Sequence, residues 1–158
     1  MSVVPTKFFE WTPFPVEVHC LDFSAAAISF QLNVVGKVSP GHRNSNIFGV
    51  CADVTNIPYK NDTFHLITDK GTMDSLMKDR EKGVQNSQEM LSEIERTLCK
   101  GGTFLQVTDE DPDSRMLYLE TNGSKTINWQ FSILADTEQD NKEIFIYSFT
   151  KQVPEDKV

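Results

Sequence analysis

The sequence predicts an α/β fold in which a mostly parallel, doubly wound sheet ends in an antiparallel hairpin. Strand-like segments alternate with helix-like segments along most of the chain, as in parallel strands joined by helical crossovers. The predicted parallel strands are residues 16–23, 47–53, 65–69 and 103–109. Two alternating apolar segments, 127–134 and 143–152, then flank the polar stretch 135–143, which predicts a hairpin. A chain of 158 residues accommodates these elements in a single domain, 1–158, with its core over 16–152.

Apolar patterning defines the first predicted strand and helix. Residues 16–23, VEVHCLDF, are rich in apolar and β-branched side chains, as expected of a buried parallel strand. Ser24 is a favourable N-cap for the next helix, because its hydroxyl can accept a hydrogen bond from the first helical turn. Ile28, Leu32 and Val35 recur at helical spacing, so we expect this face of the helix to be buried.

The clearest helical signal lies at residues 87–99, SQEMLSEIERTLC. Asn86 and Glu89 resemble a capping box at its start, and Gly101 and Gly102 follow its end as a stop signal. The apolar face predicted to be buried consists of Met90, Leu91, Ile94 and Leu98.

Two shorter helices are predicted directly after strands. One begins near Met73 with Thr72 as its cap, and the other has Asp111 as N-cap and Pro112 at its first position. In the hairpin, aromatic residues at strand spacing are predicted to pack in the core or at its edge. These residues are Trp129, Phe131, Phe145, Tyr147 and Phe149.

The composition excludes some classes of partner. The formal net charge of −8 argues against nucleic acid, because phosphate binding requires clustered Lys and Arg. No apolar run reaches the roughly 18 residues of a transmembrane helix, so no membrane span is predicted. Cys20, Cys51 and Cys99 are widely spaced in apolar surroundings, which predicts buried thiols in a reducing compartment and no metal site.

Aspartates lie at the carboxyl ends of four predicted strands: Asp22, Asp53, Asp69 and Asp109. Ligands bind at these ends in open parallel sheets, so the four carboxylates define a candidate site. Asp22 could accept hydrogen bonds from both hydroxyls of a ribose. Asp53 could accept one from an adenine amine while Val54 packs on the ring. The alternative for each is a surface acid that caps or begins the next segment.

Asp69, Lys70, Gly71 and Thr72 form an unusual turn after the third predicted strand. An unpaired buried charge is costly, so Asp69 and Lys70 should either stay solvated or engage a ligand. Gly71 would let a ligand approach the backbone closely. The alternative is a tight strand-to-helix turn whose lysine points into water.

A second acidic cluster follows the fourth predicted strand in the stretch TDEDPD, residues 108–113. Carboxylates such as Asp109 and Asp111 beside a cofactor would attract a lysine side chain and orient its amine. The alternative is a helix cap in a solvated loop, and Asp111 fits that description well. The histidines are scattered over unrelated segments, so no catalytic histidine is predicted.

Four short motifs resemble those of one enzyme family. DKGT at 69–72 and DEDPDSR at 109–115 are the most specific, and SPGH at 39–42 and LDFS at 21–24 support them. With the terminal hairpin, they make residues 7–152 similar to the seven-β-strand S-adenosylmethionine-dependent methyltransferases with an Asp-Lys-Gly-Thr signature. The resemblance implies a Rossmann-like class I methyltransferase sheet and S-adenosyl-L-methionine as cofactor.

The resemblance also implies which residues bind the cofactor. Asp22, together with Phe23, would bind the ribose. Asp53 and Val54 would flank the adenine. Asp69 and the turn that follows it would lie near the methionine moiety. The strand-end positions of these aspartates are consistent with this arrangement.

The implied reaction is methyl transfer to a lysine of a protein substrate. Lys70 and Asp69 would lie beside the acceptor channel, and Asp109 and Asp111 near the incoming lysine. The most similar branch of the family methylates citrate synthase, so the resemblance implies that substrate and the mitochondrial matrix. No transit peptide is visible in this chain.

One feature of the family is not found in this chain. The family begins with a helix and then a strand that ends in a glycine-rich Asp-x-Gly-x-Gly loop around the methionine end of the cofactor, whereas no glycine precedes Val16 here. We therefore expect the first βα unit to be missing, 6–15 to be the remnant of its helix and the connection to the next strand, and the domain to be N-terminally incomplete. The absent strand would be central, between 16–23 and 65–69.

Two other functions remain open from the sequence. A chain without the glycine loop could be catalytically inactive and act only as a binding module, through a sheet edge or the acidic rim. A nicotinamide-dependent enzyme is the other alternative, because an acid after the second strand is common to both cofactor classes. The terminal hairpin and the DKGT motif favour the methyltransferase over the nicotinamide enzyme.

Overall fold

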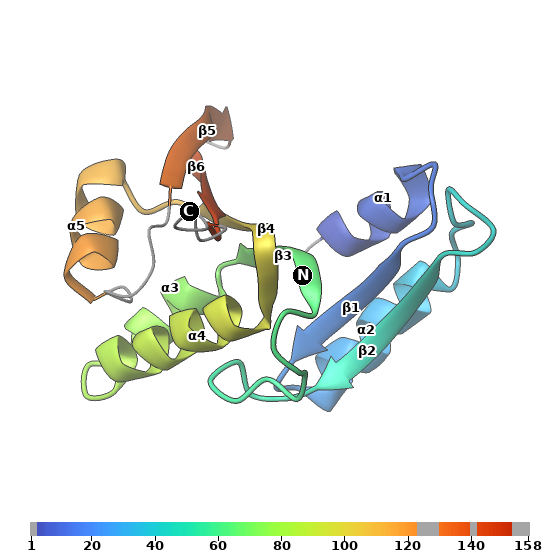
Figure 1. The fold of residues 1–158 in the computed structure, drawn as a ribbon, viewed down its shortest axis with the longest axis horizontal. Helices are drawn as coiled ribbons and strands as arrows, with labels where there is room; N and C mark the ends of the chain where they lie inside the picture. Colours follow the sequence, from blue (N-terminus) through green and yellow to red (C-terminus); the bar gives the residue numbers. More distant parts are fainter. Residues whose placement is uncertain (1–2, 123–129, 140–141, 153–158) are drawn as a thin grey trace, which may run out of the picture. The chain divides into compact units, whose positions relative to one another are not determined.

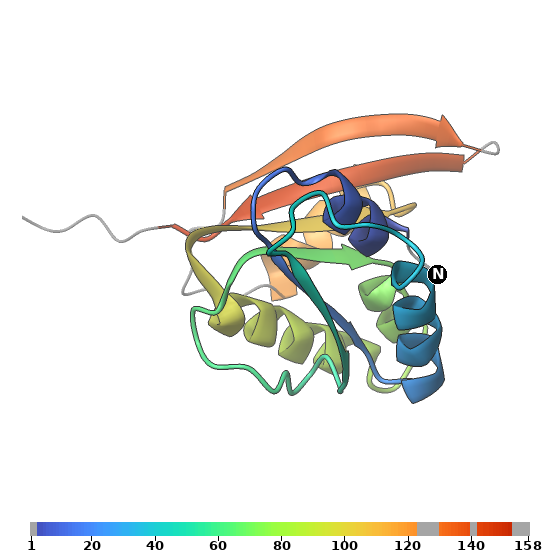
Figure 2. The same ribbon diagram turned by 90° about the vertical axis from the view of Figure 1, so that its right-hand side faces the viewer.

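The computed structural model describes residues 3–122, 130–139 and 142–152. They form two compact units, Met1–Val54 (unit 1) and Thr55–Val158 (unit 2). Unit 1 contains a two-stranded parallel sheet, and unit 2 a four-stranded mixed sheet with antiparallel strands at one side (Figures 1 and 2). The predicted α/β class, with parallel strands first and an antiparallel hairpin last, is confirmed.

Unit 1 is built around two parallel strands. Its elements are α1 (Val4–Trp11), β1 (Glu17–Asp22), α2 (Ala25–Val35) and β2 (Asn46–Cys51). The strands pair in register from Glu17 with Asn46 to Asp22 with Cys51, and α2 packs against both (Figure 1). Ser24 caps α2 as predicted, because its Oγ accepts a hydrogen bond from the N–H of Ala27 at 3.3 Å.

The buried face of α2 differs by one residue from the prediction. Ile28 and Val35 are buried as expected, but Leu32 is exposed. Gln31 is buried in its place, and its Nε2 donates to Thr6 Oγ1 on α1 at 3.1 Å. Helical periodicity within residues 24–35 does not predict this contact with α1. Because of the contact, Gln31 is buried in place of Leu32.

Unit 2 holds the remaining elements. They are β3 (Phe64–Lys70), α3 (Thr72–Met77), α4 (Gly83–Thr97), β4 (Leu98–Thr108), α5 (Pro112–Asn122), β5 (Gln130–Gln139) and β6 (Lys142–Thr150). The strand order is β3-β4-β6-β5. β3 and β4 are parallel, whereas β6 pairs antiparallel with both β4 and β5. Helices α3 and α4 pack against each other beneath the parallel pair (Figure 2).

The core of unit 2 follows the predicted apolar faces. Met90, Leu91, Ile94 and Leu98 are all buried. Phe145, Tyr147 and Phe149 of β6 are buried as well, and the Phe149 ring stacks on Phe104 with 5.7 Å between centroids. Trp129 and the side chain of Phe131 lie outside the described residues.

The ends of α4 were predicted wrongly. The helix begins at Gly83 and ends at Thr97, so Asn86 lies inside it, with its backbone N–H donating to Lys82 O at 2.8 Å. The expected capping box is therefore not its start. Gly101, with φ of 75°, lies in the irregular first part of β4, where its N–H donates to the carbonyl of Lys151. The glycine pair lies in an irregular part of a strand instead of ending a helix.

The strand β5 is also longer than predicted. Residues 135–139, which the sequence suggested as a polar connection, continue the strand and pair with β6. The register shifts between Ile133 and Ala135. Such an irregularity breaks the alternation of side chains from which a strand is recognised in a sequence.

The predicted burial of the cysteines holds for one of them. Cys20 is buried in β1, and burial raises the pKa of its thiol. Cys51 is exposed at the end of β2, and Cys99 is half-buried in the irregular start of β4. Both lie where a strand begins or ends, so neighbouring residues cover them incompletely.

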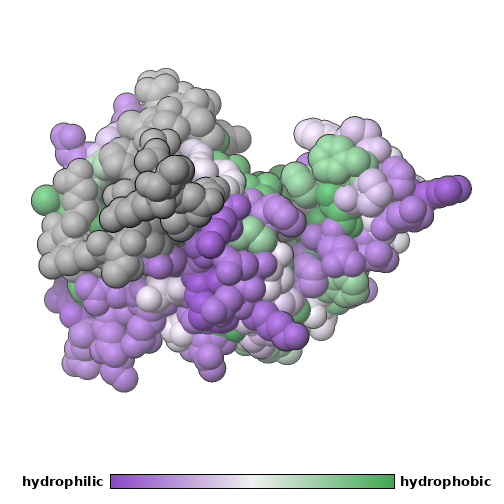
Figure 3. Space-filling model, viewed as in Figure 1, coloured by the Kyte–Doolittle hydropathy of each residue, from purple (hydrophilic) through white to green (hydrophobic). Residues whose placement is uncertain are grey.

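The surface of unit 1 is apolar in places. Large apolar side chains of α1 and the segment after it are exposed, and part of this surface appears green in Figure 3. They include Val4, Phe8, Trp11 and Phe14. Across the residues that the structure describes, no helix is both long and apolar enough to cross a bilayer.

Candidate functional site

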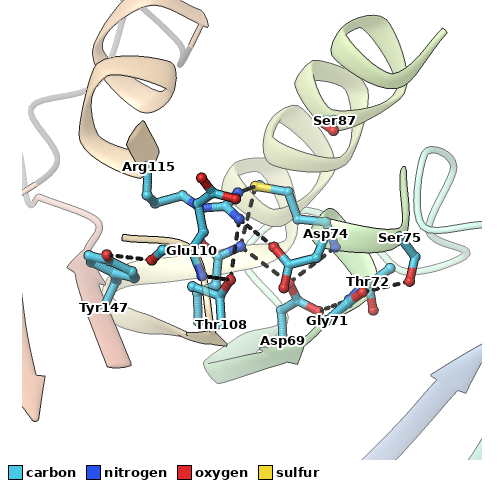
Figure 4. A network of polar contacts seen from close by, with 12 residues as sticks. Asp69, Gly71, Thr72, Asp74, Ser75, Ser87, Thr108, Glu110, Arg115 and Tyr147 are labelled. Carbon is cyan, nitrogen blue, oxygen red and sulfur yellow. Dashed lines mark hydrogen bonds and ion pairs between the residues drawn. The ribbon is translucent and has the colours of Figure 1, made fainter. Parts of the chain in front are cut away.

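The DKGT turn is organised by Asp69, at the end of β3. This side chain is 5% exposed and accepts hydrogen bonds from the backbone N–H groups of Thr72 at 2.9 Å and Met73 at 3.3 Å. Gln106, which lies on β4, donates to it as well, with 3.3 Å between its Nε2 and Oδ2 of Asp69 (Figure 4). Asp69 therefore caps α3, and the prediction that Thr72 does so was wrong, because Thr72 is the first helical residue.

Gly71 gives the turn its shape. Its φ of 86° lies in the left-handed region, which disfavours any side chain. The carbonyl of Gly71 accepts a hydrogen bond from Ser75 Oγ at 2.8 Å, which holds it against the first turn of α3. Lys70, the last residue of β3, is exposed, so its amine is free of the buried cluster that Asp69 forms.

Arg115, in the first turn of α5, joins this turn to the segment after β4. It is 3% exposed and forms an ion pair with Asp74 of α3 through Nη2. Its Nη1 donates to Met73 Sδ at 2.8 Å, and Nη2 also reaches Thr108 Oγ1 at 3.4 Å (Figure 4). Sequence reasoning assigned no role to Arg115, although it ends the DEDPDSR motif and stands alone as a cation among acids.

The segment after β4 is held from two sides. The N–H of Glu110 donates to Thr108 Oγ1, and its carbonyl accepts from the Tyr147 hydroxyl, each at 3.1 Å. Asp111 caps α5, as predicted, by accepting from the N–H and the hydroxyl of Ser114. These hydrogen bonds lower the pKa of Asp111 below its ordinary value. The backbone is thus fixed while the side chains of Glu110 and Asp111 stay exposed.

The segments after β3 and β4 lie at the same end of the sheet. Asp69 pairs in register with Gln106, and Lys70 with Val107, so the two parallel strands finish together. The exposed Asp109 follows directly. The arrangement places a cationic side chain, a buried carboxylate and several exposed carboxylates at one strand end, where ligands bind in such sheets.

Unit 1 has its own pair of acids at a strand end. Asp22 is half-buried, and its Oδ1 accepts a hydrogen bond from the N–H of Ser24 at 2.8 Å. Phe23 is 85% exposed. Because Asp22 is the register partner of Cys51, the exposed Asp53 and the half-buried Val54 begin at the same end of the sheet. The structure thus groups these four residues in unit 1.

Comparison with known proteins gives the relatives of this chain. No family model matches it. It is 32% identical over 127 residues to human citrate synthase-lysine N-methyltransferase, mitochondrial, over 75% of this chain and 52% of that protein. The zebrafish protein of the same name is 33% identical over 123 residues, covering 75% and 48%. The chain therefore spans about half the length of the curated relatives it matches.

Solved structures share the fold at low sequence identity. The S-adenosyl-L-homocysteine complex of N-methyltransferase NodS from Bradyrhizobium japonicum matches with a TM-score of 0.60, 12% identity, and coverage of 85% of this chain and 66% of that one. A SAM-dependent methyltransferase from Methanosarcina mazei matches with a TM-score of 0.63 and 13% identity, covering 87% and 82%. The chain thus has the Rossmann-like fold of class I S-adenosylmethionine-dependent methyltransferases and is similar in sequence to the citrate synthase-lysine methyltransferases.

Proposed function

We propose that the chain is a protein-lysine N-methyltransferase that uses S-adenosyl-L-methionine. The observation that carries the proposal is the turn around buried Asp69 beside a fixed acidic segment, at the strand end where this fold binds ligands. The similarity to lysine methyltransferases over 75% of the chain supports it. The names of these relatives favour citrate synthase as the substrate and the mitochondrion as the location.

The residues of unit 1 fit the nucleoside part of the cofactor. Ser24 N–H occupies Oδ1 of Asp22, and within the described residues nothing donates to Oδ2, which can accept from ribose hydroxyls. Phe23 offers an exposed ring beside it. We assign the adenine to Asp53 and Val54 at the end of β2, where an exposed carboxylate can accept from the exocyclic amine.

The residues of unit 2 are assigned to the methionine end and the acceptor lysine. Asp69 fixes the backbone of the turn, and we assign the exposed Lys70, Asp109 and Asp111 to the path of the lysine. Exposed carboxylates attract the lysine side chain and orient its amine by hydrogen bonding. The cofactor, when bound, supplies a methyl group on a sulfonium.

The reaction requires no covalent bond between the protein and the methyl group. A neutral lysine nitrogen forms the new bond to the methyl carbon as the carbon–sulfur bond breaks, and the amine proton is lost to solvent. Alignment of the amine behind the methyl group and exclusion of water supply the rate enhancement. The exposed acids after β4 are suited to that alignment, because their backbone is fixed on both sides of Glu110.

Calorimetric titration of S-adenosyl-L-homocysteine into the purified chain tests the proposal. We expect saturable one-to-one binding that weakens about tenfold or more in Asp22→Ala, because a hydrogen bond to a charged group is lost. Glu17→Ala, at the other end of β1, is the matched control and should bind as the wild type does. A folded chain that binds nothing would favour a binding module, and selective binding of NADH would favour a nicotinamide enzyme.

The substrate is tested separately by mass spectrometry. Citrate synthase incubated with the chain and S-adenosyl-L-methionine should gain methyl groups on lysine. Methylation of other mitochondrial proteins in an extract, with citrate synthase unmodified, would retain the enzyme class and refute the substrate.

A further inference from the structure

We propose that Arg115 is a positioning residue that couples the acceptor turn (residues 69–72) to the acidic loop (residues 109–113). The coupling runs through the ion pair of Arg115 with Asp74. The proposal rests on the proposed function, because both segments are assigned to the lysine acceptor. It links the two motifs physically, because the guanidinium of a DEDPDSR residue contacts the helix that the DKGT motif begins.

The first argument is the burial of the guanidinium. Arg115 is 3% exposed and Met73, which it contacts, is fully buried. Removing a charge from water is costly unless it is paired, and Asp74 supplies the pair from the first turn of α3. The planar guanidinium directs several N–H groups at once, so a single side chain contacts both α3 and the end of β4.

The second argument is that the pairing is incomplete. Arg115 Nε and Gln106 Oε1 are buried, and the residues that the structure describes provide no hydrogen-bond partner for either. Both side chains donate to the sulfur of Met73 instead. Buried polar groups without partners destabilise a fold, so this cluster is not optimised for stability. Buried polar atoms without partners next to a candidate site call for an explanation other than stability, and a positioning role supplies one.

The third argument is the second anchor of the acidic loop. Thr108 and Tyr147 hold the two peptide groups of Glu110 from β4 and β6. Arg115 then ties the start of α5 to α3, which begins directly after the acceptor turn. The loop is thus fixed on both sides of Glu110 and at the start of α5 (Figure 4), and the exposed side chains of Asp109 and Asp111 extend from this fixed backbone.

Four variants test the coupling: Arg115→Met, Asp74→Leu, their double variant and Arg115→Lys. The first readout is amide hydrogen exchange in peptides 69–77 and 108–119. We expect Arg115→Met and Asp74→Leu each to speed exchange in both segments by roughly tenfold, since each leaves one charge of the pair without its partner. The double variant should recover part of the loss because no unpaired charge remains, and Arg115→Lys should lie between.

The second readout separates positioning from folding. With citrate synthase as substrate, Arg115→Met should raise KM about tenfold while the affinity for S-adenosyl-L-homocysteine stays within about twofold. Arg96→Met is the matched control, because Arg96 also forms an ion pair, with Glu93, and holds the carbonyls of Ile57 and Tyr59. It should lower thermal stability without faster exchange in either segment.

The outcomes distinguish this proposal from the proposed function. Exchange that changes equally in Arg96→Met and Arg115→Met would overturn the coupling, and so would a parallel loss of cofactor-product affinity and activity in Arg115→Met. Faster exchange in both peptides of the Arg115 and Asp74 variants, in a chain that does not bind S-adenosyl-L-homocysteine, would support the coupling and refute the proposed methyltransferase function. Unchanged exchange in a chain that binds S-adenosyl-L-homocysteine would refute the coupling and leave the proposed function standing.

Discussion

Acids at the strand ends of the two units have the same sequence signature and different environments. In unit 2, Asp69 is buried and accepts three hydrogen bonds from the chain itself. In unit 1, Asp22 is half-buried and accepts one, and Asp53 is exposed. An acid at the end of a strand can therefore fix the local backbone, as Asp69 does, or keep oxygen atoms available to a ligand, as Asp22 does. Its burial and the number of hydrogen bonds that it accepts from the protein distinguish the two roles.

The largest expected effect is that of Asp69→Ala. Three donors in a buried cluster would lose their acceptor, so we expect the free energy of unfolding to fall by about 2–5 kcal/mol. Urea denaturation followed by circular dichroism measures it. Asp69→Asn keeps one carbonyl acceptor and should cost less, and Asp22→Ala should change stability little. Equal losses for Asp69→Ala and Asp22→Ala would remove the distinction between the two acids.

Unit 1 depends instead on the packing of α2 over β2, which Gly49→Ala tests. A Cβ at this position would lie 2.5 Å from Ile28 Cγ2 and 2.9 Å from Leu32 Cδ1. We expect a loss of about 1–3 kcal/mol from overpacking. Hydrogen exchange should rise in β1 and β2 and stay unchanged in β3 and β4.

Gly36→Ala is the control for this substitution. The added Cβ would lie 3.4 Å from the nearest atom, Leu32 O, and the residue has φ of −59°, which alanine adopts readily. It should be neutral or slightly stabilising. A destabilisation similar to that of Gly49→Ala would mean that backbone freedom, rather than contact with α2, explains the glycines of unit 1.

Local patterns were predictable from the sequence. The apolar face of α4 follows from helical periodicity, and the caps at Ser24 and Asp111 follow from side chains that act within a few residues. Errors arose where distant residues intervene. The contact of Gln31 with Thr6 sets the buried face of α2, and Lys151 accepts the N–H of Gly101 where a helix end was expected.

The candidate site shows the same limit. The four strand-end aspartates were identified because each follows an apolar run, which is a local signal. That Asp69 is buried depends on Gln106, 37 residues away, and the role of Arg115 depends on Asp74, 41 residues away. A single sequence does not show which distant residues are in contact, so it does not distinguish an acid that caps a helix from one that is available to a ligand.

A smaller effect is expected for Tyr147→Phe, which removes the hydrogen bond to Glu110 O and keeps the buried ring. The loss should be about 1 kcal/mol, because the exposed Glu110 can bond to water instead. Exchange in the acidic loop should rise more than in the acceptor turn. Tyr118→Phe, whose hydroxyl donates to Val84 O on α4, is the control and should leave the acidic loop unchanged. An unchanged loop in Tyr147→Phe would mean that Thr108 and Arg115 hold it without the tyrosine.

The smallest effect concerns pH and lies in unit 2, away from the candidate site. The hydrogen bond from Arg96, with that from Ile57 N–H, lowers the pKa of Glu93 below its ordinary value. A lowered pKa means that this pairing stabilises the fold above the ordinary glutamate pKa of about 4.3, and that the contribution is lost as the pH falls through the lower folded value.

Urea midpoints of the wild type and Glu93→Gln between about pH 7 and pH 3 measure this contribution. We expect the wild type to be the more stable at neutral pH and the difference to shrink steadily below about pH 4.3, with most of the change in exchange at residues 57–61, which Glu93 and Arg96 hold. A difference that is constant with pH would show that the glutamate acts through packing. Asp111 also loses its capping of α5 in this pH range, because its pKa is lowered too. This loss is the same in the wild type and in Glu93→Gln, so the difference between their urea midpoints does not contain it. The comparison thus separates the effect of Glu93, which holds a loop against α4, from that of Asp111, which caps the helix beside the candidate site.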